Sequence, residues 1–339
     1  MRSVRLLVLY SLVLLLAGGC GFGGMPEAER VLMHGPAPQY DDTLVTVGFI
    51  QTGKESDWRD ANTQDYFRVF TEANGYRFLY IDGNSRPERQ VKALYDLVRQ
   101  QVDYIVLDPI VEAGWTDALL AARDAGIPVI ITDRRVDADA SLYTCWVGSD
   151  FEEEGRKAGR WLAQYLEQAG RAGEQINIVI LEGTPGSSAT LGRAAGLAEI
   201  VSAHPEWHVV ANAVANFTQG EGQTVMQELI GRIDSFDVLI THNDNMMFGA
   251  MKAMERNDIA FGLDGGVITV SFDALRQAFD EMIAGRLHAT VECNPLLADL
   301  TDKIIRRLEA GEPVDKVYYS EESIFTHENA AASLPARAY

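Results

Sequence analysis

The chain has 339 residues, with 29 lysines and arginines against 49 aspartates and glutamates, and a formal net charge of −20 at pH 7. This balance excludes nucleic acid as the expected partner, because proteins bind phosphates through clustered cations. The acidity fits a solvated surface better than it fits an acidic binding patch.

Residues 1–20 have the pattern of an export signal. Two arginines precede an apolar run over residues 6–16, and small residues then lead to Cys20. A run of about 11 residues is shorter than the roughly 20 that a membrane-spanning helix needs, so it predicts a cleaved signal peptide. The small residues before Cys20 resemble the lipobox of bacterial lipoproteins, which implies lipidation of Cys20. Ala17 stands where that motif prefers leucine, so ordinary cleavage elsewhere in the run stays open.

Residues 21–42 contain glycines, prolines and charges without apolar periodicity. This composition predicts a tether between the membrane and a folded body that begins near Leu44. About 295 residues then remain, which is too many for one comfortable core and the usual size for two domains.

Two cysteines remain once Cys20 is assigned to the anchor. Cys145 and Cys293 are too few for a disulfide framework and have no metal-ligand spacing, so no metal site is predicted. Two buried free thiols are the simplest expectation. Both cysteines lie beside predicted crossovers between domains, so a disulfide between them stays open.

From Leu44 onward, short β-branched runs alternate with longer amphipathic stretches, which is the rhythm of βαβ units. The predicted strands of the first half are Leu44–Ile50, Arg77–Ile81, Tyr104–Leu107 and Ile127–Thr132. The predicted helices are one that begins near Asp57, and those over Pro87–Gln100 and Trp115–Ala125. The fourth strand is apolar on both faces, which is typical of a buried parallel sheet.

The rhythm repeats after Cys145–Gly148, which predicts a second domain of similar design. Its predicted strands are Asn177–Leu181, His208–Ala213, Asp237–Thr241, Val267–Ser271 and His288–Cys293. Its predicted helices are Phe151–Gln168, Ser188–Ala203, Gly220–Arg232, Asn245–Asn257 and Ala274–Ala284. A helix over Pro295–Ala310 and a segment over Val317–Ile324 follow. The predicted fold class is α/β, with two doubly wound parallel-sheet lobes.

Polar residues follow the predicted strands in both halves. They are Gln51, Asp82, Asp108, Asp133 and Arg134 in the first half, and Glu182, Asn216, Asn243, Asp244 and Asp273 in the second. Taken singly, each residue is expected to cap a helix or to stabilise a turn. Ligands of open parallel sheets bind beyond the carboxyl ends of the strands, so the ordered set predicts a polar cleft. Carboxylates, amides and guanidinium groups suit a polyhydroxylated ligand.

Eight short segments are spread in order between about Val45 and Ile324. They are Lys54–Arg59, Gly114–Trp115, Asp133–Arg134, Gly183–Thr184 with Arg193, Asn216–Thr218, Thr241–Asp244, Ser271–Asp273 and Val291–Pro295. Together they resemble the type I periplasmic sugar-binding proteins of ABC transporters, and in particular the galactofuranose-binding branch. Each segment is short, but their ordered occurrence along the folded chain is specific.

The resemblance implies eight sugar-binding residues. These are Trp58, Arg59, Asp133, Arg134, Arg193, Phe217, Asn243 and Asp273. Further polar candidates are Gln51, Glu55, Asp108, Asn216 and Asn294. An indole at Trp58 would stack on the apolar C–H face of the sugar while hydrogen bonds satisfy its rim. The alternative for Trp58 is a core position in the first helix.

The resemblance also implies a hinge of three crossovers, placed near Gly148, Val291 and Val314. The first lobe is then 43–147 plus 294–314, and the second lobe is 148–293 plus 315–339. A ligand bound between the lobes stabilises the closed form, because it contacts both of them. The implied protein is the solute-binding component of a sugar ABC importer, a monomer in the bacterial cell envelope that uses no cofactor and meets a membrane permease.

Three rival functions follow from the same residues. An enzyme is disfavoured because the histidines form no metal pattern, and no nucleophile elbow, phosphate loop or dinucleotide fingerprint is present in the right context. The effector lobe of a sugar-responsive repressor is disfavoured because the chain begins with an export signal rather than a basic helix-turn-helix. A subunit that presents its ligand to a membrane sensor stays open, as does the identity of the sugar.

Overall fold

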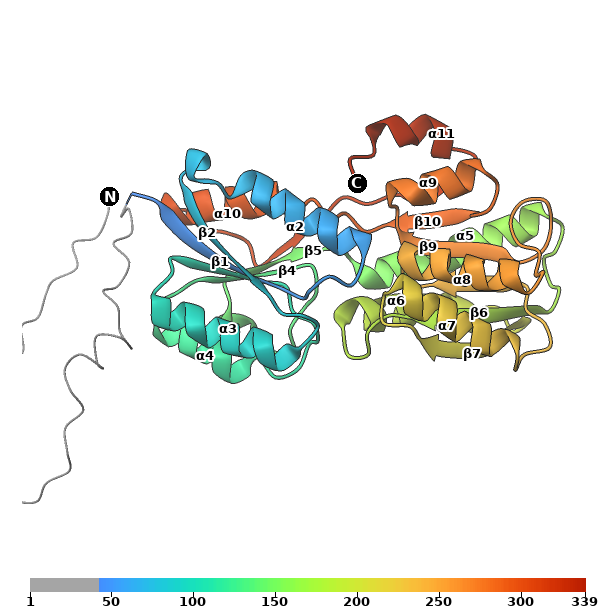
Figure 1. The fold of residues 1–339 in the computed structure, drawn as a ribbon, viewed down its shortest axis with the longest axis horizontal. Coiled ribbons are helices and arrows are strands. Elements are labelled where there is room, and N and C mark those ends of the chain that lie inside the picture. Colours follow the sequence, from blue (N-terminus) through green and yellow to red (C-terminus); the bar gives the residue numbers. More distant parts are fainter. Residues whose placement is uncertain (1–42) are drawn as a thin grey trace, which may run out of the picture. The chain divides into compact units, whose positions relative to one another are not determined.

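The computed structural model describes residues 43–339, which form a single structural unit. The predictions for the signal peptide 1–20, the tether 21–42 and Cys20 lie outside the described residues. Within the described part, twelve strands form two sheets of six strands each (Figure 1). The predicted fold class is confirmed.

The first lobe is built on a parallel sheet in the order β11-β5-β4-β3-β1-β2. Its strands are β1 (Val45–Gln51), β2 (Tyr76–Asp82), β3 (Tyr104–Leu107), β4 (Val129–Thr132), β5 (Cys145–Gly148) and β11 (Val317–Tyr319). Its helices are α2 (Asp57–Val69), α3 (Pro87–Gln100), α4 (Thr116–Asp124) and α10 (Ala298–Glu309). Two short 3-10 turns, Glu72–Asn74 and Ala140–Leu142, lie in its loops.

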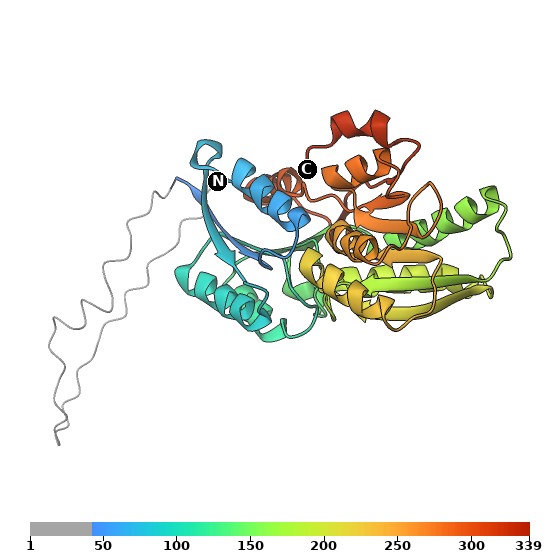
Figure 2. The same ribbon diagram turned by 45° about the vertical axis from the view of Figure 1, so that its right-hand side comes forward.

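Helices cover both faces of the first sheet. Figures 1 and 2 show α10 beside α2 on one face, with α3 and α4 on the other. Tyr66 of α2 and Ile305 of α10 share one buried cluster with Phe49 of β1, while Leu97 of α3 and Leu119 of α4 belong to the opposite one. Strands β3 and β4 are buried along their whole length, as continuous apolar runs predict.

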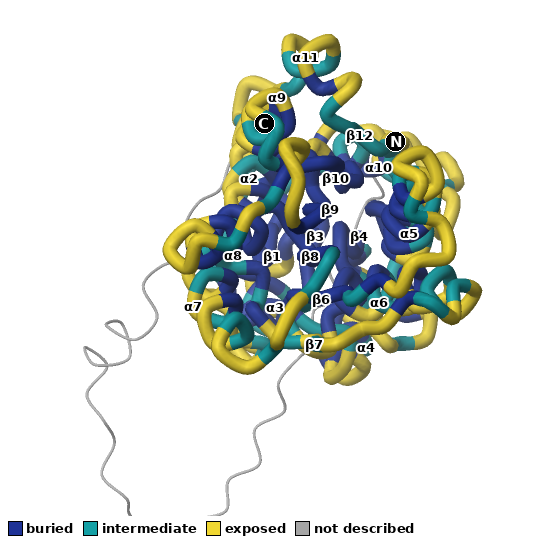
Figure 3. The backbone as a smooth tube through the Cα atoms, turned by 90° about the vertical axis from the view of Figure 1, so that its right-hand side faces the viewer, coloured by how far each residue is buried: buried dark blue, intermediate teal, exposed yellow. Residues whose placement is uncertain are grey.

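The second lobe has the sheet order β12-β10-β9-β8-β6-β7. Its strands are β6 (Ile176–Glu182), β7 (Trp207–Val214), β8 (Val238–Thr241), β9 (Ile268–Asp273), β10 (Ala289–Glu292) and β12 (Ile324–Thr326). Its helices are α5 (Phe151–Gln168), α6 (Ser188–Ser202), α7 (Gln219–Ile230), α8 (Asp244–Arg256), α9 (Arg276–Ile283) and α11 (Ala330–Ser333), followed by a 3-10 turn at Leu334–Ala336. The sheet is parallel except for β12, which runs antiparallel to β10. Figure 3 shows the central strands of the sheets buried beneath helices whose outer faces are exposed, whereas the edge strand β7 is largely exposed.

The chain crosses between the lobes after β5, after β10 and between β11 and β12. The boundary predicted near Val314 assigned residues 315–339 to the second lobe. This assignment is wrong for Val317–Tyr319, which belong to the first lobe. Strand β11 pairs in parallel with β5, with Val317 opposite Trp146, so it extends the first sheet. The predicted single segment Val317–Ile324 is therefore two strands on different sheets, joined by the third crossover at 320–323.

Both remaining cysteines are buried and free, so the disulfide that the sequence left open between Cys145 and Cys293 does not form. Among residues 43–339, no helix combines the length and apolar character needed to cross a bilayer.

Candidate ligand-binding site

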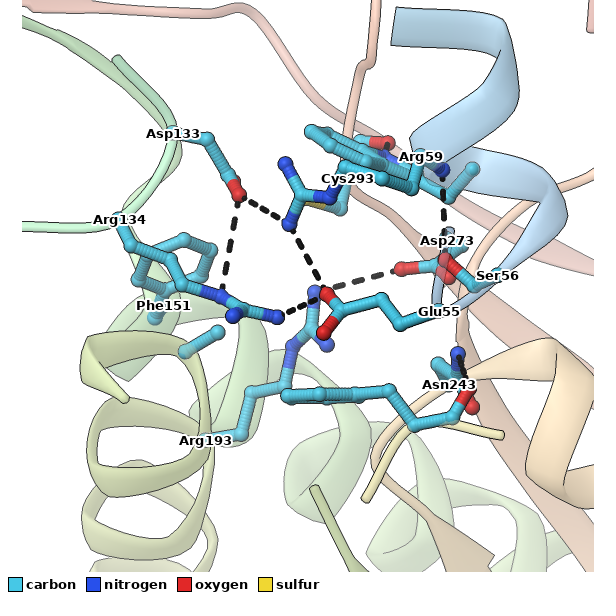
Figure 4. Close-up of a pocket in the computed structure, with 13 residues that line it drawn as sticks. Glu55, Ser56, Arg59, Asp133, Arg134, Phe151, Arg193, Asn243, Asp273 and Cys293 are labelled. Atoms are coloured by element: carbon cyan, nitrogen blue, oxygen red, sulfur yellow. Dashed lines mark hydrogen bonds and ion pairs between the residues drawn. The ribbon is translucent and has the colours of Figure 1, made fainter. Parts of the chain in front are cut away.

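A pocket lies between the two lobes. It is lined by Glu55, Ser56, Trp58, Arg59, Asp133, Arg134, Phe151, Ala189, Arg193, Phe217, Asn243, Asp273 and Cys293. Figure 4 shows arginine and carboxylate groups from both lobes converging on one space.

The start of α2 brings Trp58 and Arg59 into the pocket. Ser56 caps the helix, because its Oγ accepts a hydrogen bond from the backbone N of Arg59 at 3.3 Å. The indole Nε1 of Trp58 donates to the carbonyl oxygen of Cys293 at 2.6 Å, which holds the ring against the second crossover. Trp58 also packs in the apolar cluster of the second lobe, so it lines the pocket and belongs to the core at once.

Arg59 is the centre of the charge network in the first lobe. Its Nη2 contacts Asp133 Oδ2 at 2.9 Å and Glu55 Oε1 at 3.1 Å, and its Nη1 donates to Asp108. Burial opposes the charged form of this guanidinium, but the three carboxylates outweigh it and raise the pKa of Arg59. The arginine therefore stays charged in the closed cleft.

The turn after β4 places Asp133 and Arg134 side by side. Asp133 has a φ of 54°, and its carbonyl oxygen accepts a hydrogen bond from Trp146 Nε1 at 3.0 Å. Arg134 is 2% exposed and donates to Glu55, while its guanidinium lies 5.0 Å from the ring centroid of Phe217. This cation–π contact joins the two lobes across the pocket.

Arg193 of α6 is the corresponding cation in the second lobe. Its Nε donates to Glu154 Oε2 at 2.7 Å, its Nη1 donates to the carbonyl oxygen of His242, and its Nη2 lies 3.5 Å from Asp273 Oδ1. Burial opposes its charge, but Glu154 and its neighbours raise the pKa of Arg193. Burial raises the pKa of Asp273, and the Arg193 guanidinium counters that effect.

Phe217 forms an aromatic wall from an unusual backbone conformation. Its φ is 62°, a left-handed value that is costly for a bulky residue. Asn243 caps α8 by accepting from Met246 N at 2.9 Å, and its Nδ2 donates to the Phe217 carbonyl oxygen at 2.9 Å. Gly183 lies directly under the Phe217 ring, where any Cβ would overlap it. The cap and the glycine together fix the wall.

Replacing Gly183 with Ala is expected to push the Phe217 ring out of position and to lower the free energy of unfolding by about 1–3 kcal/mol. Ligand affinity should fall with it. Gly220→Ala in α7 is the matched control, because nothing lies within 4 Å of its added Cβ and alanine is the better helix former. Denaturant unfolding of the two variants measures this, and equal stability would contradict the role of Gly183.

Several buried polar atoms around the pocket have no hydrogen-bond partner within the described chain. They include Arg59 Nε, Arg134 Nε and Asp108 Oδ1. Buried donors and acceptors are normally satisfied, so unused N–H groups on two pocket arginines leave capacity for ligand oxygens.

The structure brings all eight residues of the main predicted set, and Glu55, around one pocket. The other four candidates lie outside its lining. Asp108 lies behind Arg59, Gln51 donates to Asn62, Asn216 donates to Glu221, and Asn294 Oδ1 accepts from Leu296 N. They hold neighbouring side chains and a turn in place, and none of the four caps a helix.

Sequence reasoning missed four lining residues, namely Ser56, Phe151, Ala189 and Cys293. Phe151 opens α5 directly after its N-cap Asp150, at the first crossover. Its place beside a predicted crossover was a usable signal. Ala189 carries no such signal, because alanine favours helices wherever they occur and so does not mark a pocket.

Comparison with known proteins decides the family. A model described as periplasmic binding protein domain matches residues 47–298. The chain belongs to the periplasmic binding protein family. This periplasmic binding protein is 32% identical over 295 residues to the galactofuranose-binding protein YtfQ of Escherichia coli strain K12, covering 86% of the chain and 90% of YtfQ.

Solved structures of similar proteins have the same fold. A protein from Mycobacterium smegmatis in complex with β-D-fucofuranose is 37% identical with a TM-score of 0.81, over 86% of this chain and 94% of that one. The binding component of the arabinose ABC transporter of Shewanella sp. ANA-3, bound to α- and β-L-arabinofuranose, is 33% identical with a TM-score of 0.79, over 86% and 95% of the two chains.

Proposed function

We propose that this periplasmic binding protein is the solute-binding component of a sugar ABC importer, and that it encloses one monosaccharide between its lobes. The observation that carries the proposal is the pocket itself, in which arginines and carboxylates from both lobes surround a space walled by Trp58, Phe151 and Phe217. Aromatic walls suit the C–H face of a sugar ring, and charged planar groups suit its hydroxyls.

Galactofuranose, or a sugar of similar shape, is the favoured ligand. Three similar proteins are described with furanose sugars, namely galactofuranose, β-D-fucofuranose and L-arabinofuranose. Another pentose or hexose is the alternative.

A screen of free pentoses and hexoses by thermal shift tests the proposal. A sugar that binds only the folded protein at a hundred times its Kd stabilises it by about 2.7 kcal/mol, a readily measured increase in Tm. At least one furanose-forming sugar should raise the Tm. A flat response over the whole panel would refute monosaccharide binding.

Closure is proposed to depend on direct bonds between the lobes as well as on the ligand. Asp57 at the start of α2 donates its backbone N–H to Asn245 Oδ1 at 3.1 Å, and Asn245 Nδ2 donates to Asp57 Oδ2 at 2.9 Å. Arg135 N also donates to Ser188 Oγ at 2.7 Å. These bonds exist only when the lobes meet, so they stabilise the closed state.

Asn245→Ala is expected to weaken sugar binding by about 1–3 kcal/mol, because two hydrogen bonds of the closed form are lost. The loss should appear chiefly as faster dissociation in stopped-flow measurements. Asn257→Ala is the control, since Asn257 bonds to Gln227 and Ala253 within the second lobe. Equal dissociation rates in both variants would contradict a role of the Asp57–Asn245 hydrogen bonds in holding the lobes closed.

We further propose that the protein is a monomer tethered to the cell envelope through a lipid on Cys20. Changing Cys20 to Ser should move the protein from the membrane fraction to the soluble fraction, because a cleaved chain without a lipid has no anchor. Unchanged fractionation would contradict the lipid anchor and would leave the sugar site untouched.

We also propose that the protein has no catalytic activity. Although carboxylates in a cleft are compatible with glycosidase chemistry, the carboxylates Glu55 and Asp133 are engaged by arginines. Incubation with galactofuranosides should release no sugar, and turnover would contradict the proposal.

A further inference from the structure

The three crossovers between the lobes meet at one carboxylate, that of Glu322. Its Oε1 accepts hydrogen bonds from Ser320 Oγ at 2.8 Å, from Asn294 N at 3.1 Å and from Ser149 Oγ. Ser149 belongs to the first crossover, Asn294 to the second, and Glu322 with Ser320 to the third. One acceptor therefore connects every segment that joins the lobes.

A second carboxyl group lies beside it. Glu154, on the first turn of α5, is 0% exposed. Carboxyl oxygens of Glu154 and Glu322 and the Cys293 Sγ all lie within 4.8 Å of one another. Glu154 Oε2 accepts from Arg193 Nε at 2.7 Å, but Glu154 Oε1 has no hydrogen-bond partner. Glu154 thus links the crossovers to an arginine of the sugar pocket.

Two adjacent carboxylates repel one another, and desolvation penalises the charge on the buried Glu154 and on the partly buried Glu322. Burial raises the pKa of Glu154 to about 8 and also raises the pKa of Glu322. A proton on Glu154 would turn the unpartnered oxygen into a donor to Glu322, and one negative charge would then remain on the pair. The geometry fits a protonated Glu154 next to an ionised Glu322 that accepts its hydrogen bond.

Other charged and titratable groups face the pair or its partners. Lys157 of α5 donates to the Glu322 carbonyl oxygen, and Arg193 of α6, Cys293 and Asp273 of β9 interact with Glu154. His242 before α8 and Asp244 of α8 interact with Arg193, and Asp133 after β4 interacts with Cys293. Arg193 already donates to Glu154 Oε2. A single proton between Glu154 Oε1 and the Glu322 carboxylate is then enough to remove the repulsion between the two groups.

We propose that Glu154 and Glu322 share a single proton at the hinge, and that its loss weakens sugar binding because it disturbs both the crossovers and Arg193. This inference rests on the proposed function for the affinity readout. Glu154 is a positioning residue in this scheme, since it acts on the sugar through Arg193 and does not line the pocket.

The sign of the pH dependence follows from the extra proton of the folded state. Glu154 binds a proton between its ordinary pKa of 4.5 and its folded pKa of about 8, whereas the unfolded chain does not. Its contribution to stability therefore falls as pH rises through that window. Above pH 8 the proton is lost from the closed state, and the two carboxylates repel across the hinge.

The test is the slope of sugar Kd against pH in the wild type and in Glu154→Gln, measured from about pH 6 to pH 9.5 around the folded pKa. Wild-type Kd should rise with pH up to about pH 8, by at most tenfold per pH unit for one linked proton, because only the closed state holds the proton in that window, and it should level off above pH 8. Glutamine copies the protonated acid, because its amide donates to Glu322 and its oxygen accepts from Arg193. The increase should disappear in Glu154→Gln and also in Glu322→Gln.

Two controls identify the titrating group. Glu153→Gln removes a partly exposed acid from the same helix, one that pairs with Arg156 and Arg160, and should keep the wild-type slope. Cys293→Ser should keep it as well. A slope lost in Cys293→Ser would assign the proton to the thiol and would overturn the proposal. One equivalent of Zn²⁺ bound by the wild type and lost in Cys293→Ser would also overturn it, since a metal would replace the proton.

The ligand-free protein provides an independent readout. The Tm of the wild type should fall more steeply between pH 6 and pH 8 than the Tm of Glu154→Gln. If Tm and Kd depend on pH equally in the wild type and in Glu154→Gln, the shared proton is refuted even if sugar binds well. Absence of binding by every sugar at every pH would instead refute the proposed function, and the Tm comparison would still decide the proton.

Discussion

Arg193→Ala is expected to weaken sugar binding by about 2–5 kcal/mol, which is roughly 30-fold to several thousand-fold in Kd. The side chain bonds to Glu154 and the His242 carbonyl oxygen and lies beside Asp273. Its removal deletes a cation from the pocket and leaves two buried carboxyl groups without it. Calorimetric titration with the sugar that the screen identifies gives the loss directly.

Arg232→Ala is the matched control for Arg193. Arg232 is exposed at the end of α7 and pairs only loosely with Glu228, at 3.6 Å. Its replacement should leave Kd unchanged, because surface ion pairs contribute little. Wild-type affinity in a folded Arg193→Ala variant would remove this residue from the site.

Arg59→Ala is expected to lower the free energy of unfolding by about 3–5 kcal/mol, because it leaves buried carboxylates without a counter-charge. Three carboxylates, those of Glu55, Asp108 and Asp133, contact this one guanidinium. The loss should shrink when the pH is lowered. Burial raises the pKa of Asp108, so protonation relieves the folded variant at a higher pH than it relieves the unfolded chain.

Denaturant unfolding at two pH values measures this effect, with Arg68→Ala as the control on the same helix. Arg68 is 56% exposed in its side chain, and its replacement should cost under about 1 kcal/mol. Equal destabilisation by the two substitutions would show that the charge network around Arg59 is not essential to the first lobe.

Most of the fold follows from local patterns in the sequence. The continuous apolar runs at β4 and β8 and the amphipathic segments at α3 and α5 indicate their own structure, because burial and periodicity act on near neighbours. Pro87 marks the start of α3, and the N-cap Asp150 marks the start of α5. Predicted helix ends agree with the structure to within a few residues, except that the helix predicted from Pro295 begins at Ala298.

The error at the third crossover shows what local patterns leave out. Val317–Tyr319 and Ile324–Thr326 are each three residues long, and which sheet each one joins depends on partners far away in the sequence. Pairing of Val317 with Trp146 is a tertiary contact, and no periodicity in either segment encodes it.

The site could be predicted where a residue follows a strand. Asp133 and Asn243 follow that rule, Asp273 is the last residue of its strand, and each of the three also has a matching family segment. The rule fails to separate Asn216 from Phe217, because both have positive φ and only the backbone geometry decides which side chain faces the pocket. Glu154 was not predicted because its significance depends on Glu322, which is far from it in the chain.

Isothermal titration of the purified protein with the sugar panel, repeated with Arg134→Ala and Asp273→Ala, tests most directly whether a monosaccharide binds between the lobes. The predicted result is saturable binding of one sugar per chain, weakened by about 2–4 kcal/mol in each variant, since each residue contributes from a different lobe. Binding that is unchanged in both variants, or no binding by any sugar of the panel, would contradict it.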